Sequence, residues 1–211
     1  MKYLIKELIE EGVLKTPSII EAFEKIDRKD FTPEGLRDKA YLNTPLPIGY
    51  GQTISQPLTV AFMLELLQPK SGDKVLEVGS GSGWQTALLS SVVGEPPNEG
   101  GKVFALELIP ELMIFGQKNV AKYGFIKKKI AEFHSLNAIN GLPDEAPFDK
   151  IISAASGEEL PSAWKEQLKV GGRIVAPIKN SIHLFVKKGE NEFEETIYHG
   201  FAFVPLVGFS D

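Results

Sequence analysis

The segment Glu77–Gln85, EVGSGSGWQ, constrains the fold of this chain more than any other. Its three glycines alternate with small residues, directly after the apolar run Lys74–Val78 and directly before a helical pattern. Glycine adopts left-handed backbone angles and leaves room for a close neighbour, so the segment predicts a tight turn from a strand into a helix. Turns of this kind belong to βαβ units, which build parallel sheets. We therefore expect an α/β core in which a ligand can approach the glycine turn.

Short apolar runs alternate with helical patterns after this turn, which favours the same fold class. The sequence predicts five strands of a mostly parallel sheet, at residues 74–78, 102–108, 129–134, 150–154 and 173–177. Two further strands, at 182–187 and 193–207, are expected to form a hairpin around Gly189-Glu190-Asn191. The prediction is a doubly wound, Rossmann-like α/β fold with a C-terminal β-hairpin.

The N-terminal region has a different pattern. Charged residues interrupt every apolar stretch of MKYLIKELIEEG, so this start resembles neither a signal peptide nor a membrane span. Helices are predicted over residues 2–12, after Thr16-Pro17, where the threonine supplies an N-cap, and after Thr32-Pro33. Residues 41–56 are rich in proline and glycine without a sustained period, which predicts an ordered loop. A further helix is predicted over residues 57–67.

Composition favours one globular domain. The 211 residues are 43% hydrophobic and 24% charged, which is enough apolar material for one sizeable core and short for two domains. Residues 1–56 are expected to form the helical region with its loop, and residues 57–211 the Rossmann-like core. The net charge of −5 argues against a nucleic-acid partner, and the absence of cysteine excludes disulfides. We expect a cytoplasmic monomer that binds neither nucleic acid nor membrane.

The glycine spacing indicates which ligand the turn takes. A dinucleotide-binding turn has the pattern G-x-G-x-x-G, but here the third glycine, Gly83, comes one place early and Trp84 follows it. This spacing favours a methionine nucleoside over a pyrophosphate and argues against an oxidoreductase. Glu77 is predicted to favour cationic groups of the ligand, and Glu107 to bind both ribose hydroxyls. Asn137 is placed to bind the adenine amino group. The alternative is that the turn serves packing alone.

Five blocks of sequence occur in order along residues 35–208. The most specific is Tyr41–Pro57, YLNTPLPIGYGQTISQP, and it is followed by EVGSGSGWQTALL, GLPDEAPFDKII, QLKVGGRIVAPI and FVPLVG. Together they resemble the protein-L-isoaspartate O-methyltransferases. The resemblance implies a class I S-adenosylmethionine-dependent methyltransferase with N-terminal helices and a modified C-terminal hairpin. The implied activity is methyl transfer from S-adenosylmethionine to the α-carboxylate of L-isoaspartyl residues in damaged proteins or peptides, leaving S-adenosylhomocysteine.

The resemblance also assigns residues. It places the active-site serine at Ser55, in a loop that covers cofactor and substrate and includes Thr53, Ile54 and Gln56. From the residues alone, Ser55 is an N-cap of the helix that follows, and the resemblance leads us to expect both roles. No metal site is predicted. The remaining members of the expected cofactor-binding set are Gly79, Ser80, Gly81, Ser82, Gly83, Leu108 and Ala138.

Several positions depart from the family pattern. Asn137 stands where the family has the acid of a Gly-Asp-Gly motif, Asn43 where it has aspartate, and Ala202 where it has arginine. The family's Ala-Ala-Pro is Ala154-Ala155-Ser156 here. These changes leave two alternatives open. One is a methyltransferase with another acceptor, and the other is a protein that binds S-adenosylmethionine or its product without catalysis.

Overall fold

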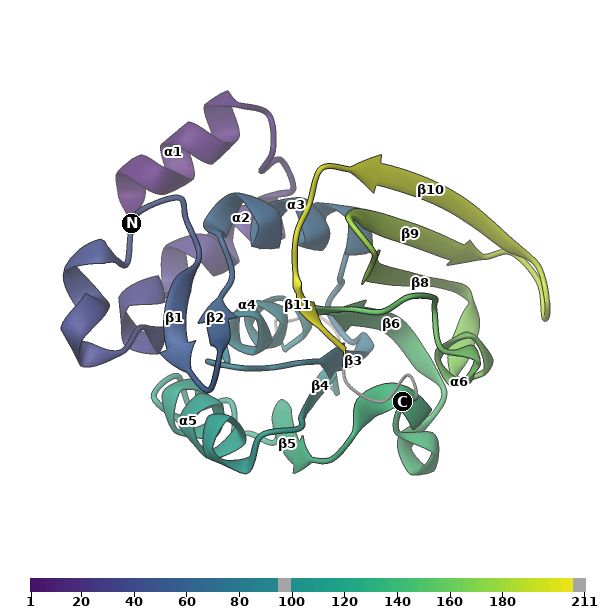
Figure 1. Ribbon diagram of the computed structural model, residues 1–211. Helices are drawn as coiled ribbons and strands as arrows, with labels where there is room; N and C mark the ends of the chain where they lie inside the picture. The colour runs from purple at the N-terminus through teal and green to yellow at the C-terminus, as the bar shows by residue number, and fades with distance from the viewer. Residues whose placement is uncertain (95–99, 207–211) are drawn as a thin grey trace.

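A computed structural model describes residues 1–94 and 100–206 of the chain (Figure 1). The strands of its central sheet are β3 (Lys74–Val78), β4 (Lys102–Glu107), β5 (Ala131–Ser135), β6 (Phe148–Ser153), β8 (Leu168–Ile178), β9 (Ser181–Lys187) and β10 (Phe193–His199). Their order in space is β10-β9-β8-β6-β3-β4-β5. The strands from β3 to β8 pair in parallel, whereas β9 pairs antiparallel with both β8 and β10. The predicted sheet and C-terminal hairpin are therefore confirmed.

The strand order reverses at β3. From β3 the chain moves outward through β4 to β5, and it then crosses to the other side of β3 to add β6 and β8. In open α/β sheets, ligands bind beyond the carboxyl ends of the strands at such a reversal. Because the glycine turn follows β3 directly, the topology brings it to this position.

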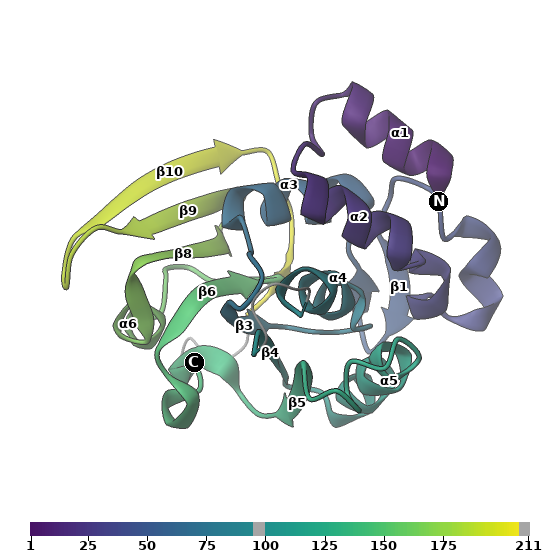
Figure 2. The same cartoon turned by 180° about the vertical axis from the view of Figure 1, so that it is seen from behind.

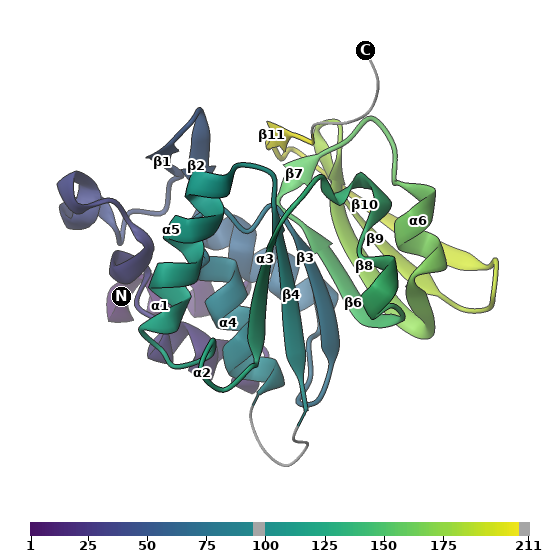
Figure 3. The ribbon, with the colours of Figure 1, turned by 90° about the horizontal axis from the view of Figure 1, so that it is seen from below.

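Helices cover both faces of the sheet. One face carries α1 (Lys2–Glu10), α2 (Pro17–Lys25), α3 (Pro57–Leu67), α4 (Trp84–Val93) and α5 (Pro110–Ala121), and the other carries α6 (Ser162–Glu166) and the 3-10 helix η3 (Ala138–Asn140). Figure 3 shows α4 and α5 on one side of the strands and α6 on the other, and Figure 2 shows α2 beside α4. Each face of the sheet has its own hydrophobic core. In β3, the side chain of Val75 packs in the core beside α1 to α5, whereas Leu76 and Val78 pack in the core beside α6 and η3. No helix in the described ranges is long and apolar enough to cross a membrane.

Two glycines allow α4 and α5 to lie very close together. Gly83 precedes α4 with a φ of +83°, and a Cβ there would lie 2.7 Å from the carbonyl oxygen of Gly116 in α5. A Cβ on Gly116 would lie 2.8 Å from the carbonyl oxygen of Gly81. These obstacles are backbone atoms, which cannot rotate away as a side chain can. Gly83 is therefore required for helix packing, a different role from the ligand binding that its motif predicted.

The N-terminal helices form, but the predicted cap of α2 does not. Thr16 stands at the N-cap position, yet its hydroxyl makes no capping hydrogen bond. It donates instead to Glu65 Oε2 in α3, at 2.7 Å. The 3-10 helices η1 (Arg28–Phe31) and η2 (Glu34–Lys39) follow α2. A side-chain contact to a distant helix has replaced the local cap, so α2 is tied to α3.

The predicted loop at residues 41–56 contains a small hairpin. Leu46–Gly49 (β1) and Gln52–Ile54 (β2) pair antiparallel, and three successive left-handed residues, Gly49-Tyr50-Gly51, close the turn. Strands are predicted from alternating apolar and polar residues over at least four positions. Proline and glycine interrupt that alternation here, so the prediction of a continuous loop was wrong.

The C-terminal segment also differs from its prediction. The strand expected over residues 193–207 ends at His199, because Gly200 has a φ of +93° and turns the chain. Val204–Pro205 (β11) then pairs in parallel with Ala155–Ser156 (β7), outside the central sheet. Figure 1 shows this yellow segment passing from β10 to the middle of the molecule. Residues 207 and 208, the last two of the FVPLVG block, lie outside the described residues.

Four of the predicted strands begin at other residues than expected, and of these β9 differs least, since it starts at Ser181 instead of residue 182. β5 starts at Ala131 instead of residue 129, because Lys129 has a left-handed φ of 59° and belongs to the preceding turn. β6 starts two residues early, at Phe148, and β8 starts at Leu168 instead of residue 173. Gly171 and Gly172 lie within β8, and glycine weakens the strand pattern in the sequence.

Candidate functional site

A cavity of about 360 Å³ opens at the carboxyl ends of β3, β4 and β6. Cavities of this size take small organic molecules. Its wall combines the glycine turn and the strand ends with residues 52–56, 136–138 and 202–206. Figure 3 shows the β1–β2 hairpin and the β7–β11 pair at the same end of the sheet. The fold thus gathers segments from across the sequence around one cavity.

All but two of the predicted site residues line this cavity. The exceptions are Glu77 and Gly83. The residues that do line it are Thr53, Ile54, Ser55, Gln56, Gly79, Ser80, Gly81, Ser82, Glu107, Leu108, Asn137 and Ala138. Their position brings them together, and the role of each stays a prediction.

Glu107 is fixed in the cavity wall by two backbone groups. Its side chain ends β4, where Oε2 accepts a hydrogen bond from the Gly81 N–H at 2.8 Å and Oε1 accepts one from the Ile109 N–H at 3.0 Å. A carboxylate has about four lone-pair sites, so each oxygen retains capacity for another donor. Glu107 is therefore both held in place and able to accept hydrogen bonds from hydroxyl groups of a ligand.

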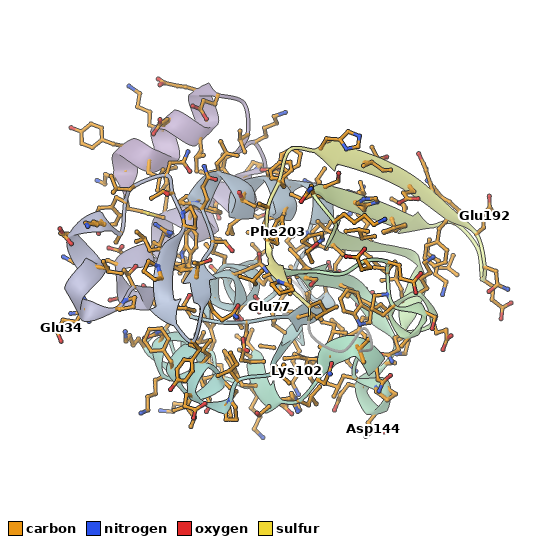
Figure 4. All side chains as sticks on the ribbon, viewed as in Figure 1. Glu34, Glu77, Lys102, Asp144, Glu192 and Phe203 are labelled. Carbon is orange, nitrogen blue, oxygen red and sulfur yellow. The ribbon has the colours of Figure 1, made fainter. Side chains whose placement is uncertain are left out.

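Glu77, labelled in Figure 4, lies in β3 just before the glycine turn and is not among the residues that line the cavity. It is fully buried, and its carboxyl is hydrogen-bonded to Gln85 Nε2 and Thr86 Oγ1 in the first turn of α4. Burial raises the pKa of Glu77 to about 8, although these two hydrogen bonds favour the charged form. Its two oxygens are engaged by the first turn of α4 and it does not line the cavity, so it is not placed to contact a ligand there. The predicted role is corrected: Glu77 ties β3 to α4 and so supports the turn.

The covering segment, defined as residues 41–56, brings Ser55 to the cavity. The predicted capping role of Ser55 is wrong, because Gln56 occupies the N-cap position of α3 and makes no side-chain cap. The Oδ1 of Asn43 accepts a hydrogen bond from the Leu58 N–H at 3.0 Å and satisfies this helix start instead. That contact also gives the asparagine at position 43 a structural purpose. Within the described part of the chain, the Ser55 hydroxyl has no hydrogen-bond partner and remains available.

Asn137 lies at the rim of the cavity, where it is exposed. Its Oδ1 accepts a hydrogen bond from the Ile139 N–H at 3.1 Å and caps η3. The amide oxygen therefore orders the rim locally, in addition to its predicted contact with adenine. No contact explains the alanine at position 202, which lines the same cavity.

The structure adds Trp84 and Phe203, which the sequence did not assign to ligand binding, to the cavity wall, and it shows that the predicted Ser80 is buried there. Ser80 Oγ and Trp84 Nε1 are buried in the wall without a hydrogen-bond partner among the described residues. An unpaired buried polar group costs about 1–3 kcal/mol, so a ligand with polar groups would offset this cost. Phe203, labelled in Figure 4, lies on the segment that leads into β11 and lines the cavity with Ala154. The FVPLVG block was the only signal in the sequence for this wall. The described residues contain no cluster of His, Asp and Glu that could hold a metal ion.

Comparison with known proteins places the chain among its relatives. All of residues 1–211 match the sequence model of the family described as protein-L-isoaspartate(D-aspartate) O-methyltransferase. A protein-L-isoaspartate O-methyltransferase from Methanopyrus kandleri is 40% identical over 212 residues, which cover 97% of this chain and 90% of the relative. One of the same name from Flavobacterium psychrophilum is 42% identical over 207 residues, which cover 97% and 92%. A crystal structure from Plasmodium falciparum, assigned to the same family and in complex with S-adenosyl-L-homocysteine, has a TM-score of 0.86 and 25% identity, with 97% of both chains covered.

Proposed function

Because the chain belongs to the protein-L-isoaspartate(D-aspartate) O-methyltransferase family, we propose that it is a protein repair methyltransferase. It transfers a methyl group from S-adenosylmethionine to the α-carboxylate of L-isoaspartyl residues in damaged proteins or peptides, and S-adenosylhomocysteine is the other product. One observation of the site carries this proposal. Ser55, to which the family resemblance assigns the active-site role, lines the same cavity as Glu107, the anchored carboxylate beside the glycine turn.

The residues of the cavity fit S-adenosylmethionine. Glu107 offers two fixed oxygens to the hydroxyls of a ribose. Gly79 and Gly81 have φ values of +79° and +50°, and they present backbone without side chains to a ligand. The unpaired Ser80 Oγ and Trp84 Nε1 offer further polar contacts. These features support a site for a nucleoside that carries a polar amino-acid chain.

The reaction requires little acid–base catalysis by the protein. Bound S-adenosylmethionine supplies an electrophilic methyl group. The acceptor is a carboxylate, which is already ionised at neutral pH and needs no general base. The work left to the chain is orientation and exclusion of water, which can supply on the order of 7–11 kcal/mol. Residues 52–56 and 202–206 enclose the cavity, and we assign the free Ser55 hydroxyl to the substrate carboxylate.

The test is transfer of labelled methyl to two peptides that differ only in L-isoaspartate or aspartate at one position. We expect label on the isoaspartyl peptide alone. Ser55→Ala should lower kcat/KM by roughly 10–100-fold, the effect of one hydrogen bond to a charged group, and should retain S-adenosylhomocysteine binding. Ser18→Ala is the matched control, because this serine is exposed on α2, away from the cavity.

The possible outcomes test the proposed methyltransferase function and the role of Ser55 separately. Binding of S-adenosylhomocysteine without methylation of the isoaspartyl peptide would contradict the proposed function. Full activity of Ser55→Ala would leave the function standing and remove the role of Ser55.

The proposal extends to the organisation of the chain. We infer one methyltransferase domain acting as a monomer. In support, α1 and α2 share the core that contains β3 and β4.

A further inference from the structure

Arg28 is the most unusual charged residue of the molecule. It begins η1 and is completely buried. Burial lowers its pKa to about 10, but the guanidinium stays charged at neutral pH. Buried cations are rare unless they are paired with acids. Within the described residues, however, every hydrogen bond that the Arg28 side chain donates goes to a backbone carbonyl oxygen.

These carbonyl oxygens come from both ends of one stretch of chain. At its start, Arg28 Nη1 donates to Ala40 O at 2.8 Å and to Leu42 O at 3.2 Å, and Nη2 donates to Thr44 O at 3.0 Å. At its end, Nη2 donates to Ser55 O, again at 3.0 Å. The β1–β2 hairpin lies between the two ends. One guanidinium therefore closes the base of the covering segment.

The same guanidinium also contacts the other side of the cavity. It lies over the Trp84 ring, with the guanidinium carbon 5.3 Å from the ring centroid. Trp84 is the first residue of α4, follows the glycine turn, and lines the cavity. Arg28 thus links the covering segment to the turn that is proposed to hold the cofactor.

We propose that Arg28 is a positioning residue for methyl transfer, which acts by holding the Ser55 backbone and so aiming the Ser55 hydroxyl into the cavity. This inference rests on the proposed function. The effect of Arg28 on Ser55 is direct, because the backbone carbonyl oxygen of Ser55 itself accepts one of the hydrogen bonds from the guanidinium. A lysine at position 28 would keep the charge, but its single ammonium cannot reproduce the planar fork that reaches both ends of the segment.

The first arm of the test measures catalysis in Arg28→Lys. A misplacement of about 1 Å at a reacting centre can cost about a hundredfold in rate, so kcat for an isoaspartyl peptide should fall by roughly 10–100-fold. Affinity for S-adenosylhomocysteine should fall much less. Arg173→Lys is the matched control: Arg173 Nη1 also donates to a backbone carbonyl, Leu66 O at 2.8 Å, but it does not touch the covering segment. Its kcat should stay at the wild-type value.

The second arm asks whether Arg28 works through Ser55. In a double-mutant cycle, Arg28→Lys should cost little further kcat once Ser55→Ala is present, because the group that it aims has gone. Equal fold-losses in both backgrounds would overturn the proposal and leave Arg28 with a purely structural role. If Arg28→Lys does not fold, Arg28→Gln, which removes the buried charge and keeps an amide donor, takes its place in the cycle.

The third arm needs no substrate. Hydrogen exchange should accelerate across residues 44–55 in Arg28→Lys and stay at the wild-type rate in β3 and β4. Unchanged exchange in residues 44–55 would overturn the anchoring on which the proposal depends. If the wild-type protein fails to methylate any isoaspartyl peptide, the proposed function falls and the catalytic role of Arg28 falls with it. The exchange data would then still decide whether Arg28 anchors the segment.

Discussion

The floor and the cover of the cavity are held by different kinds of interaction. The floor, residues 77–85 with Glu107, continues the backbone pairing of two central strands, since the Gly79 N–H donates to Leu106 O at 2.9 Å. The cover, the covering segment of residues 41–56, pairs regularly only with itself and is tied down by the side chains of Arg28 and Asn43. A single substitution can therefore loosen the cover while the sheet stays intact, whereas changes in the floor act on the ligand or on helix packing.

The largest effect on ligand binding is expected at the floor. Glu107→Gln replaces one of the two acceptor oxygens with a donor, next to backbone N–H groups that also donate. Hydrogen bonds to charged groups contribute about 1.5–3 kcal/mol, so affinity for S-adenosylhomocysteine should fall about 10–100-fold, as measured by calorimetry. Glu132→Gln is the control, because this acid lies on the neighbouring strand β5 and pairs with Lys102, away from the cavity. Equal affinity for S-adenosylhomocysteine in the wild type and in Glu107→Gln would show that Glu107 does not contribute to cofactor binding.

The second prediction concerns the pH dependence of the floor. The folded protein retains the Glu77 proton up to about pH 8, whereas the unfolded chain releases it near the ordinary pKa of 4.5. Unfolding between these values releases a proton, so this group lowers the free energy of unfolding as pH rises, on the order of 1 kcal/mol per pH unit. Glu77→Gln lacks the titration. In urea unfolding, the free energy of unfolding of Glu77→Gln relative to that of the wild type should increase from about pH 5 to about pH 8. A difference that does not change with pH would contradict the raised pKa.

The third prediction tests the cover. Asn43→Ala removes the acceptor at the start of α3 and should cost about 1 kcal/mol, the usual effect of a lost cap. The melting temperature should fall by about 2–4 °C in a chain of this size. Asn43→Asp should restore it, since a carboxylate accepts the same hydrogen bond. Affinity for S-adenosylhomocysteine should not change, and a loss of affinity in Asn43→Ala would show that the cover and the floor are not separable.

The smallest effect is expected at the rim. Asn137→Asp keeps the acceptor for the Ile139 N–H and adds a charge at the position proposed to contact adenine. Affinity for S-adenosylhomocysteine should rise several-fold, about 1 kcal/mol. Asn140→Asp, in the same η3 helix but outside the cavity wall, should leave the affinity unchanged. A similar gain in both variants would indicate a general effect of negative charge and no specific contact.

The floor could be predicted from sequence to a greater extent than the cover. The glycine turn and the runs at 74–78 and 57–67 carry their own local signals, and their boundaries were right. Glu77 and Glu107 could not be told apart by sequence, because both stand at the end of a buried strand. In the register of the sheet, Glu77 lies opposite Ala105 of β4, so Glu107 lies two residues further toward the carboxyl ends of the strands. That offset leaves the carboxyl of Glu77 under α4 and brings the carboxyl of Glu107 to the cavity.

The hydrogen bonds that hold the covering segment in place cannot be recognised from a pattern in the sequence. Arg28 binds backbone carbonyl oxygens, which every residue possesses, so nothing in residues 40–55 marks them as its partners. The cap from Asn43 to Leu58 joins residues 15 positions apart, well beyond the range of a local capping motif. The resemblance to a family located the covering segment, but only the folded chain shows what holds it.

The contact between Gly83 and Gly116 bears on how this motif is used to recognise relatives. Because the nearest neighbour of each glycine is a backbone carbonyl oxygen, a change of the surrounding side chains alone cannot make room for alanine at either position. Selection on the fold alone would therefore preserve the third glycine, even in a lineage that had lost its ligand. A search that scores Gly83 as a cofactor signature would retain such proteins. Glu107 is the more informative position for that question, since its side chain reaches the cavity.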